Sequence, residues 1–149
     1  MPKFTPPNPD FENYLRERFV KQKAMQTIGA TLGEVHPGEV TIHLPFHEKL
    51  TQQDGFLHAG IVTTIVDSAC GYAAFTLMPI GSRVLSVEFK VNLMSPAVGE
   101  RFVAIGKVIK PGRTISVCSG EVFAYQGEER KLVALMQATM IRIEKETSS

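Results

Sequence analysis

The stretch Gln52–Ala74 reads Gln-Gln-Asp-Gly-Phe-Leu-His-Ala-Gly-Ile-Val-Thr-Thr-Ile-Val-Asp-Ser-Ala-Cys-Gly-Tyr-Ala-Ala, and it decides the fold. It begins polar and then stays almost wholly apolar, which predicts a buried helix over about residues 59–77. One carboxylate, Asp67, interrupts the apolar run. Burying a charge is costly unless the charge is paired or has a chemical role, so Asp67 is the first candidate functional residue. The alternative is that Asp67 only accepts a hydrogen bond from a neighbouring threonine in a local polar pocket.

Composition narrows the class of protein. The chain has 149 residues, which predicts a single domain, 1–149, with a sizeable core. Its formal net charge of +1 favours neither nucleic acid nor an acidic membrane as a partner. Cys70 and Cys118 lie in apolar runs and are predicted to be free, buried thiols, which fits a reducing compartment. With no secretory signal at the start, we expect a cytoplasmic protein.

The chain before this helix predicts a second helix and a hairpin. The proline-rich residues 1–9 and the polar residues 144–149 are expected to be flexible. Apolar positions three to four apart predict an amphipathic helix over residues 11–26. Two short strand patterns, about 30–35 and 39–45, flank a Pro-Gly turn signal.

The chain after this helix predicts a sheet of long strands. Alternation and turn signals place four strands, over residues 84–94, 101–110, 114–125 and 131–143. In the first of them, strict alternation puts Ser86 on the polar face and Val91 on the apolar one. Tight turns predict that strands adjacent in sequence pair antiparallel. We therefore expect an α+β fold in which one sheet wraps one helix, whose other side needs a different cover.

The start of the central helix carries a second candidate group. His58-Ala59-Gly60 lies where helix N–H groups have no partner within the helix, so it can bind an oxyanion. Asp67 lies nine residues after His58, which is roughly 13 Å along a helix. One carbonyl group cannot contact both. If both belong to one site, the acid comes from a second copy of the helix, which predicts a homodimer with two equivalent interface sites.

These residues resemble the hotdog fold, in which an antiparallel sheet wraps a long helix, and more narrowly the PaaI-type acyl-CoA thioesterases. The family pattern is an Asn, five residues, His-Gly-Gly, and an acid nine residues after the His. Here Gln52, His58-Ala59-Gly60 and Asp67 match it, and the strand from Ser86 resembles the family's first long strand after the helix. The resemblance covers about residues 29–143. Gln52 replaces the Asn and Ala59 the first glycine.

The resemblance implies roles for these residues. Asp67 would act as general base or nucleophile, and the Ala59 amide would polarise the thioester carbonyl, next to Gly60. His58 would hold the helix start, Ser86 would position water near Asp67, and the Gln52 amide would orient water or the carbonyl. Neither a metal nor a separate cofactor is implied, since coenzyme A is part of the substrate.

The resemblance also suggests where the substrate binds. Basic and hydroxyl side chains at the predicted turn after residue 110 would hold the coenzyme A phosphates, and the candidates are Lys110, Arg113, Thr114 and, at the start of the preceding strand, Arg83. Phe56 and Leu57 in the loop would line the path of an aromatic, medium-chain or long-chain acyl group. Two alternatives stay open, a non-catalytic acyl-CoA-binding module and a hotdog acyl dehydratase. We expect the homodimers to pair further as a dimer of dimers.

Overall fold

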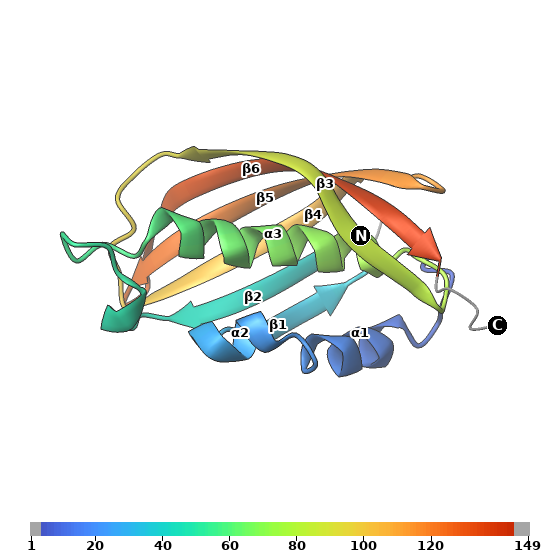
Figure 1. Ribbon diagram of the computed structural model, residues 1–149, viewed down its shortest axis with the longest axis horizontal. Coiled ribbons are helices and arrows are strands. Elements are labelled where there is room, and N and C mark those ends of the chain that lie inside the picture. Colours follow the sequence, from blue (N-terminus) through green and yellow to red (C-terminus); the bar gives the residue numbers. More distant parts are fainter. Residues whose placement is uncertain (1–3, 145–149) are drawn as a thin grey trace.

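The computed structural model describes residues 4–144; the predicted flexible residues 1–3 and 145–149 lie outside this range. Two short helices open the described chain, a hairpin and the long helix follow, and four long strands end it (Figure 1). In chain order the elements are α1 (Phe11–Phe19), α2 (Lys23–Ile28), β1 (Thr31–His36), β2 (Glu39–Pro45), the 3-10 helix η1 (Glu48–Leu50), α3 (Ala59–Phe75), β3 (Ser82–Leu93), β4 (Arg101–Lys110), β5 (Ile115–Gln126) and β6 (Glu129–Glu144).

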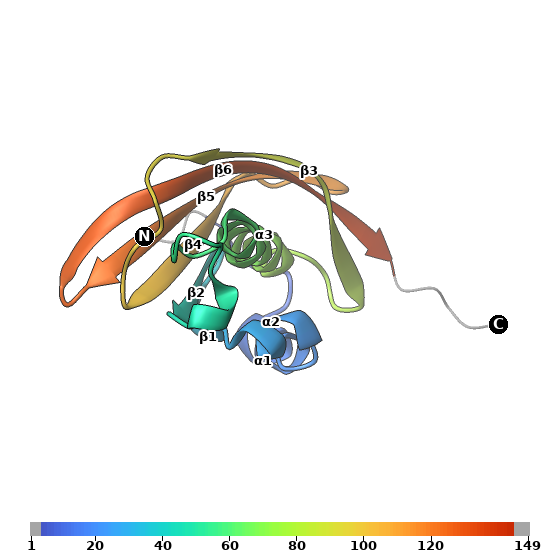
Figure 2. The ribbon, with the colours of Figure 1, turned by 60° about the vertical axis from the view of Figure 1, so that its left-hand side comes forward.

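A six-stranded sheet curves around α3. Its strand order is β1-β2-β4-β5-β6-β3, and every neighbouring pair is antiparallel. Figure 2 shows α3 in the hollow of the sheet, with α1 and α2 beside β1 and β2. The predicted α+β architecture, one long helix wrapped by an antiparallel sheet plus N-terminal helical structure, is confirmed. In residues 4–144, no helix is both long and apolar enough to cross a membrane.

A pair of glycines lets α3 lie directly on the sheet. Gly106 of β4 and Gly120 of β5 are register partners, and both face the middle of α3. A Cβ atom at Gly106 would overlap the carbonyl group of Ala69 and lie 2.5 Å from the Cys70 nitrogen. Ordinary carbon contacts are about 3.5–4.0 Å, so only glycine permits this approach. The side of α3 that carries Ala69 and Cys70 is therefore fixed against the sheet.

The position of β3 corrects one prediction. β3 pairs with β6 at the far edge of the sheet, and β5 and β6 lie between it and β4. The prediction assumed that sequence neighbours pair, which is common but not required. The seven residues from 94 to 100 connect the two strands, and an extended segment of that length reaches over 20 Å. That reach exceeds the three strand spacings between β4 and β3, of about 4.8 Å each.

A register shift in β3 corrects a second prediction. The pairing with β6 changes between Ser86 and Glu88, so Val87 is the extra residue of a β-bulge. Strict alternation put Ser86 and Val91 on opposite faces. With the bulge between them, Ser86 bonds to Asp67 of α3 and Val91 packs on the core.

The N-terminal region differs from the predicted single helix. The chain leaves helical geometry at Gln22, where φ is −80° and ψ is 99°. The Gln22 side chain bonds to Ser68 and Tyr72 of α3, which stabilises the break. Residues 4–9 form no helix or strand, but they are not free: Phe4 packs on the core and Asn8 is buried.

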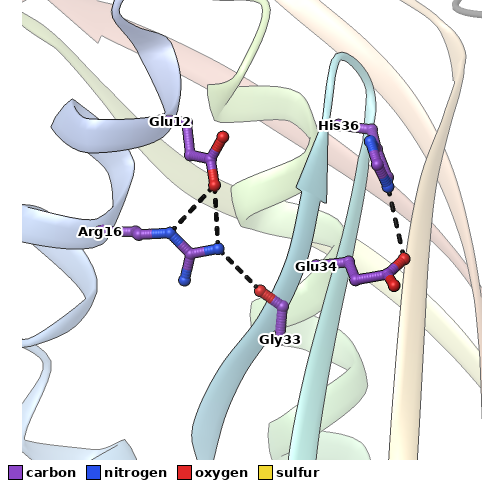
Figure 3. Close-up of polar contacts among 5 residues, drawn as sticks. All are labelled: Glu12, Arg16, Gly33, Glu34 and His36. Carbon is purple, nitrogen blue, oxygen red and sulfur yellow. Dashed lines mark hydrogen bonds and ion pairs between the residues drawn. The ribbon is translucent and has the colours of Figure 1, made fainter.

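Arg16 ties α1 to the edge of the sheet. Its guanidinium group pairs with Glu12 one helical turn earlier at 3.0 Å and donates to the Gly33 carbonyl of β1 at 3.0 Å (Figure 3). On the same strand, His36 and Glu34 lie 3.4 Å apart and are exposed. The link through Gly33 fixes α1 against β1 and so sets how α1 lies relative to α3.

Candidate functional site

Ser86 orients the carboxylate of Asp67. The Ser86 hydroxyl donates to Asp67 Oδ1 at 2.6 Å and also lies 3.4 Å from the Met140 sulfur. Short hydrogen bonds to an ionised oxygen are among the stronger ones in proteins. Thr63 and Thr64 instead donate to carbonyls four residues earlier, so the alternative in which a threonine satisfies Asp67 is not seen. Asp67 is half-buried, and within residues 4–144 no hydrogen-bond donor contacts its second oxygen.

The start of α3 presents one unused backbone donor. His58 is the N-cap, and its Nδ1 accepts from the Gly60 amide at 2.8 Å. His58 therefore holds the helix start, and the Gly60 amide is occupied. Within residues 4–144 the Ala59 amide has no acceptor, and Ala59 is exposed. Of the residues predicted here, Ala59 is the one whose N–H can reach an oxyanion.

Gln52 builds the loop that leads into α3. Its Oε1 accepts from the Asp54 amide at 2.6 Å and the Phe56 amide at 3.2 Å, which closes a turn around Gly55. Gly55 has φ of +88°, a conformation that favours glycine. Gln52 and Ala59 line the same cavity, so the loop brings this side chain beside the free amide. Because its oxygen is used in the loop, only its NH2 group can serve a ligand.

The predicted residues fall into two separate cavities. The helix-start cavity, of about 310 Å³, is lined by Gln52, Phe56, Leu57, Ala59, Val62, Val133 and residues 93–97. The acid cavity, of about 350 Å³, is lined by Arg18, Lys21, Gln22, Asp67, Ser68, Gly71, Tyr72, Phe75, Val84, Ser86 and Met140. They share no lining residue. Ala59 and Asp67 are eight residues apart on α3, roughly 12 Å, so the two groups do not meet within one chain.

The N-terminal helices contribute residues that the sequence did not single out. Arg18, Lys21 and Gln22 line the acid cavity from the end of α1 and the turn after it. Tyr72 donates to Gln22 at 3.1 Å, and burial raises the pKa of the Tyr72 phenol, so it stays a neutral donor. The sequence did carry a signal for these two cations, since Arg18 and Lys21 border the buried face of the first helix, formed by Leu15 and Phe19. That pattern could not show which element the stripe faces.

The predicted phosphate-binding residues gather at one end of the sheet. Lys110, Arg113 and Thr114 lie at the β4–β5 turn, and Arg83 of β3 pairs with Ile143 of β6. Arg142 joins the two parts, because its side chain donates to the Arg113 carbonyl at 3.0 Å and its amide to the Thr114 carbonyl at 2.8 Å. These residues together give the sheet a basic end. Arg83 belongs to it and lies three residues before Ser86 on β3.

Both cysteines are free and buried, as the sequence predicts. Burial raises the pKa of the Cys118 thiol to about 12, and burial followed by the neighbouring Cys118 and Asp67 raises that of Cys70 further. Thiols held protonated in this way are poor nucleophiles. Residues 4–144 contain no cluster of three or more histidine, cysteine or acidic side chains that could hold a metal.

Strand β3 exposes apolar side chains along the edge of the sheet. Leu85, Val87, Phe89 and Leu93 are each 45–56% exposed. The bulge at Val87 places Phe89 and Leu93 on the side of β3 that carries Ser86 and Val91, and leaves Leu85 on the other side. Single exposed apolar residues are ordinary, but several gathered on an edge strand mark an interaction surface. β3 borders the acid cavity at Val84 and Ser86 and the helix-start cavity at Leu93. This edge therefore connects the two cavities.

Comparison with known proteins identifies the family. The thioesterase superfamily matches residues 54–131, which include α3 and Asp67. A solved thioesterase family protein from Silicibacter pomeroyi is 46% identical, with a TM-score of 0.88 over 90% of this chain and 98% of that one. The E. coli PaaI protein has a TM-score of 0.82 at 15% identity, over 93% and 97% of the two chains, and so shows the shared fold alone.

Human acyl-coenzyme A thioesterase 13 is 33% identical over 90 residues, 60% of this chain and 64% of that protein. The matched segments span 62% and 56% of two curated archaeal relatives, from Halobacterium salinarum and Saccharolobus solfataricus. These matches confirm the predicted resemblance to the hotdog-fold thioesterases. The chain belongs to the thioesterase superfamily.

Proposed function

We propose that the protein is an acyl-CoA thioesterase, which hydrolyses the thioester of an acyl-CoA to a free acid and coenzyme A. One observation carries the proposal: Ser86 holds the Asp67 carboxylate at 2.6 Å, while the unpartnered Ala59 amide lies on the same helix, in a separate cavity. These are the two groups that acyl transfer to water requires, a base and an oxyanion donor. Family membership and the likeness to human acyl-coenzyme A thioesterase 13 support the same reaction class.

The chemistry follows from the two groups. The free oxygen of Asp67 accepts a proton from water, and the water oxygen attacks the thioester carbonyl carbon. The Ala59 amide, at the positive end of the α3 dipole, stabilises the oxyanion that forms. The carbon–sulfur bond then breaks, and coenzyme A leaves as the thiolate, which takes up a proton. In the alternative mechanism, the Asp67 carboxylate itself attacks the carbonyl carbon, and water then cleaves the resulting anhydride.

A complete site requires a second copy of the chain. The Asp67 of one protomer would face the Ala59 amide of its partner across a two-fold axis, giving two equivalent sites. Small residues near Asp67, such as Gly71, leave room for the partner helix, and exposed apolar side chains of β3 would be covered. Two such dimers would pair as a dimer of dimers. Free thiols support a reducing, cytoplasmic setting.

The substrate would extend away from both groups. The coenzyme A phosphates would bind the basic end of the sheet at Lys110, Arg113, Thr114 and Arg83. The acyl group would run along α3, with Phe56 and Leu57 bordering its carbonyl end in the helix-start cavity. Aromatic and medium-chain or long-chain acyl groups are candidates.

The test is Asp67→Asn, assayed by release of free thiol from a panel of acyl-CoAs. We expect turnover to fall at least a hundredfold, while sedimentation velocity and the circular dichroism spectrum stay those of the unaltered protein. Near-normal turnover in this variant, or full activity in a monomer, would contradict the proposal. Tight binding of acyl-CoA without any release would favour a binding module, and reversible hydration of an enoyl thioester would favour a dehydratase.

A further inference from the structure

The acid cavity has a positively charged end. Arg18 and Lys21 line it together with Asp67, the one carboxylate of the lining. Neither cation forms an ion pair with a carboxylate anywhere in residues 4–144. Two positive charges therefore border a concave site of about 350 Å³, whose one carboxylate among the described residues, Asp67, is ion-paired with neither of them. Both side chains are exposed, and positive charges gathered at one end of a cleft raise the local concentration of an anion.

The fold restrains the Arg18 side chain directly and Lys21 through its backbone. The Arg18 guanidinium lies 5.8 Å from the centre of the Phe75 ring, which also lines the cavity. Lys21 lies in the turn between α1 and α2, next to Gln22, which bonds to Ser68 and Tyr72 of α3. The break between α1 and α2, which the sequence did not predict, thus anchors the turn with Lys21 against α3.

Distance along α3 decides which anion the cations meet. Tyr72 and Phe75 lie five and eight residues after Asp67, roughly 7.5 and 12 Å along the helix. In coenzyme A the pantetheine arm lies between the sulfur and the nearest phosphate. Its backbone has about as many bonds as four extended amino-acid residues, so the two groups are roughly 15 Å apart when the arm is extended. A charge at the far end of a short acyl chain fits the span between Asp67 and Phe75 better.

We propose that the acid cavity receives an acyl group whose far end carries a carboxylate, held by Arg18 and Lys21. The substrate class is then the mono-CoA thioester of a short dicarboxylic acid. Apolar wall residues such as Val84 and Met140 would flank its methylene groups. The inference rests on the proposed thioesterase function and names the substrate of that same site.

The experiment compares two thioesters of equal chain length, adipoyl-CoA and hexanoyl-CoA, in the full-length protein. We expect higher kcat/KM for adipoyl-CoA. Arg18→Gln and Lys21→Gln should each lower kcat/KM for adipoyl-CoA about tenfold, the value of one lost charge-assisted contact, and leave hexanoyl-CoA unchanged. Lys23→Gln is the matched control, since Lys23 is exposed, two residues away and outside the cavity. Raising the salt concentration should lower the ratio of adipoyl-CoA to hexanoyl-CoA turnover.

The alternatives give different results. If the unaltered protein hydrolyses neither thioester nor any other acyl-CoA, the proposed function fails, and this inference fails with it. If it hydrolyses both equally and the two substitutions change nothing, the inference fails while the thioesterase function stands. If the substitutions weaken both substrates equally and also weaken inhibition by free coenzyme A, the cations hold phosphate, and the proposed carboxylate is wrong.

Discussion

Replacing Gly106 by alanine tests the contact on which the fold depends. The new methyl group would overlap the Ala69 carbonyl and lie 2.5 Å from the Cys70 nitrogen, about 1 Å inside ordinary contact distance. Those obstacles are backbone atoms of α3, so no side chain can rotate away and the helix itself must shift. Overpacking in cores costs about 1–3 kcal/mol, and alanine regains up to about 1 kcal/mol over glycine through chain entropy.

Because the obstacle is rigid, we place the overpacking cost at the upper end, which leaves a net loss of about 2 kcal/mol. For a chain of this length that loss corresponds to a fall in Tm of about 4–8 °C. Gly120→Ala should cost less, because its obstacles are the ends of the Val66 and Cys70 side chains, at 2.5 and 2.9 Å, which can move. We therefore predict a larger loss of stability for Gly106→Ala than for Gly120→Ala.

The assay is thermal unfolding followed by circular dichroism, at one protein concentration because the stability of an oligomer depends on it. Lys107→Ala is the control, since Lys107 is exposed beside Gly106 in β4 and should change stability by less than about 0.5 kcal/mol. An unchanged Tm for Gly106→Ala, or a larger fall for Gly120→Ala, would refute the reasoning about this contact.

Two further predictions concern Ser86 and the cysteines. Ser86→Ala removes the 2.6 Å bond to Asp67, so kcat should fall about tenfold with little change in Tm, whereas Ser86→Thr, which keeps the hydroxyl, should retain most activity; equal kcat in all three proteins would contradict a positioning role. The pKa of both buried thiols is raised above 9.0, so alkylation at pH 8 should be slow in the native protein and reach two thiols per chain in urea. The unfolded chain releases these protons near pH 9 and the folded chain does not, so the free energy of unfolding should fall as pH rises above about 9; rapid native labelling of either cysteine would contradict the burial.

The sequence predicted most of what is local. The hairpin at Pro37-Gly38, the long helix and the four long strands all follow from periodicity and turn residues within a few positions. The strand order did not follow, because pairing partners are chosen by tertiary packing. The edge position of β3 depends on a connection that crosses two strands, and the sequence of residues 94–100 does not indicate where in the sheet the two connected strands lie.

The site divides in the same way. The residues from Gln52 to Asp67 lie on one loop and one helix, so spacing alone placed them relative to each other. Ser86 was singled out through a resemblance, but the alternation argument put Val91 on the opposite face, because a bulge leaves no clear mark in the sequence. Arg18 and Lys21 were missed, since their place beside Asp67 depends on how α1 lies against α3.

The two faces of α3 explain why the site is split. One face is committed to the sheet by Gly106 and Gly120, and its small residues, Ala69 and Cys70, cannot also carry polar groups. Asp67 lies on an adjacent side of α3, where it bonds to Ser86 of the edge strand β3, and within one protomer that side is covered only in part. A base and an oxyanion donor on one straight helix stay roughly 12 Å apart whatever the side chains do. An antiparallel partner helix reverses the order of the two groups, and so offers the simplest way to bring base and donor to one carbonyl.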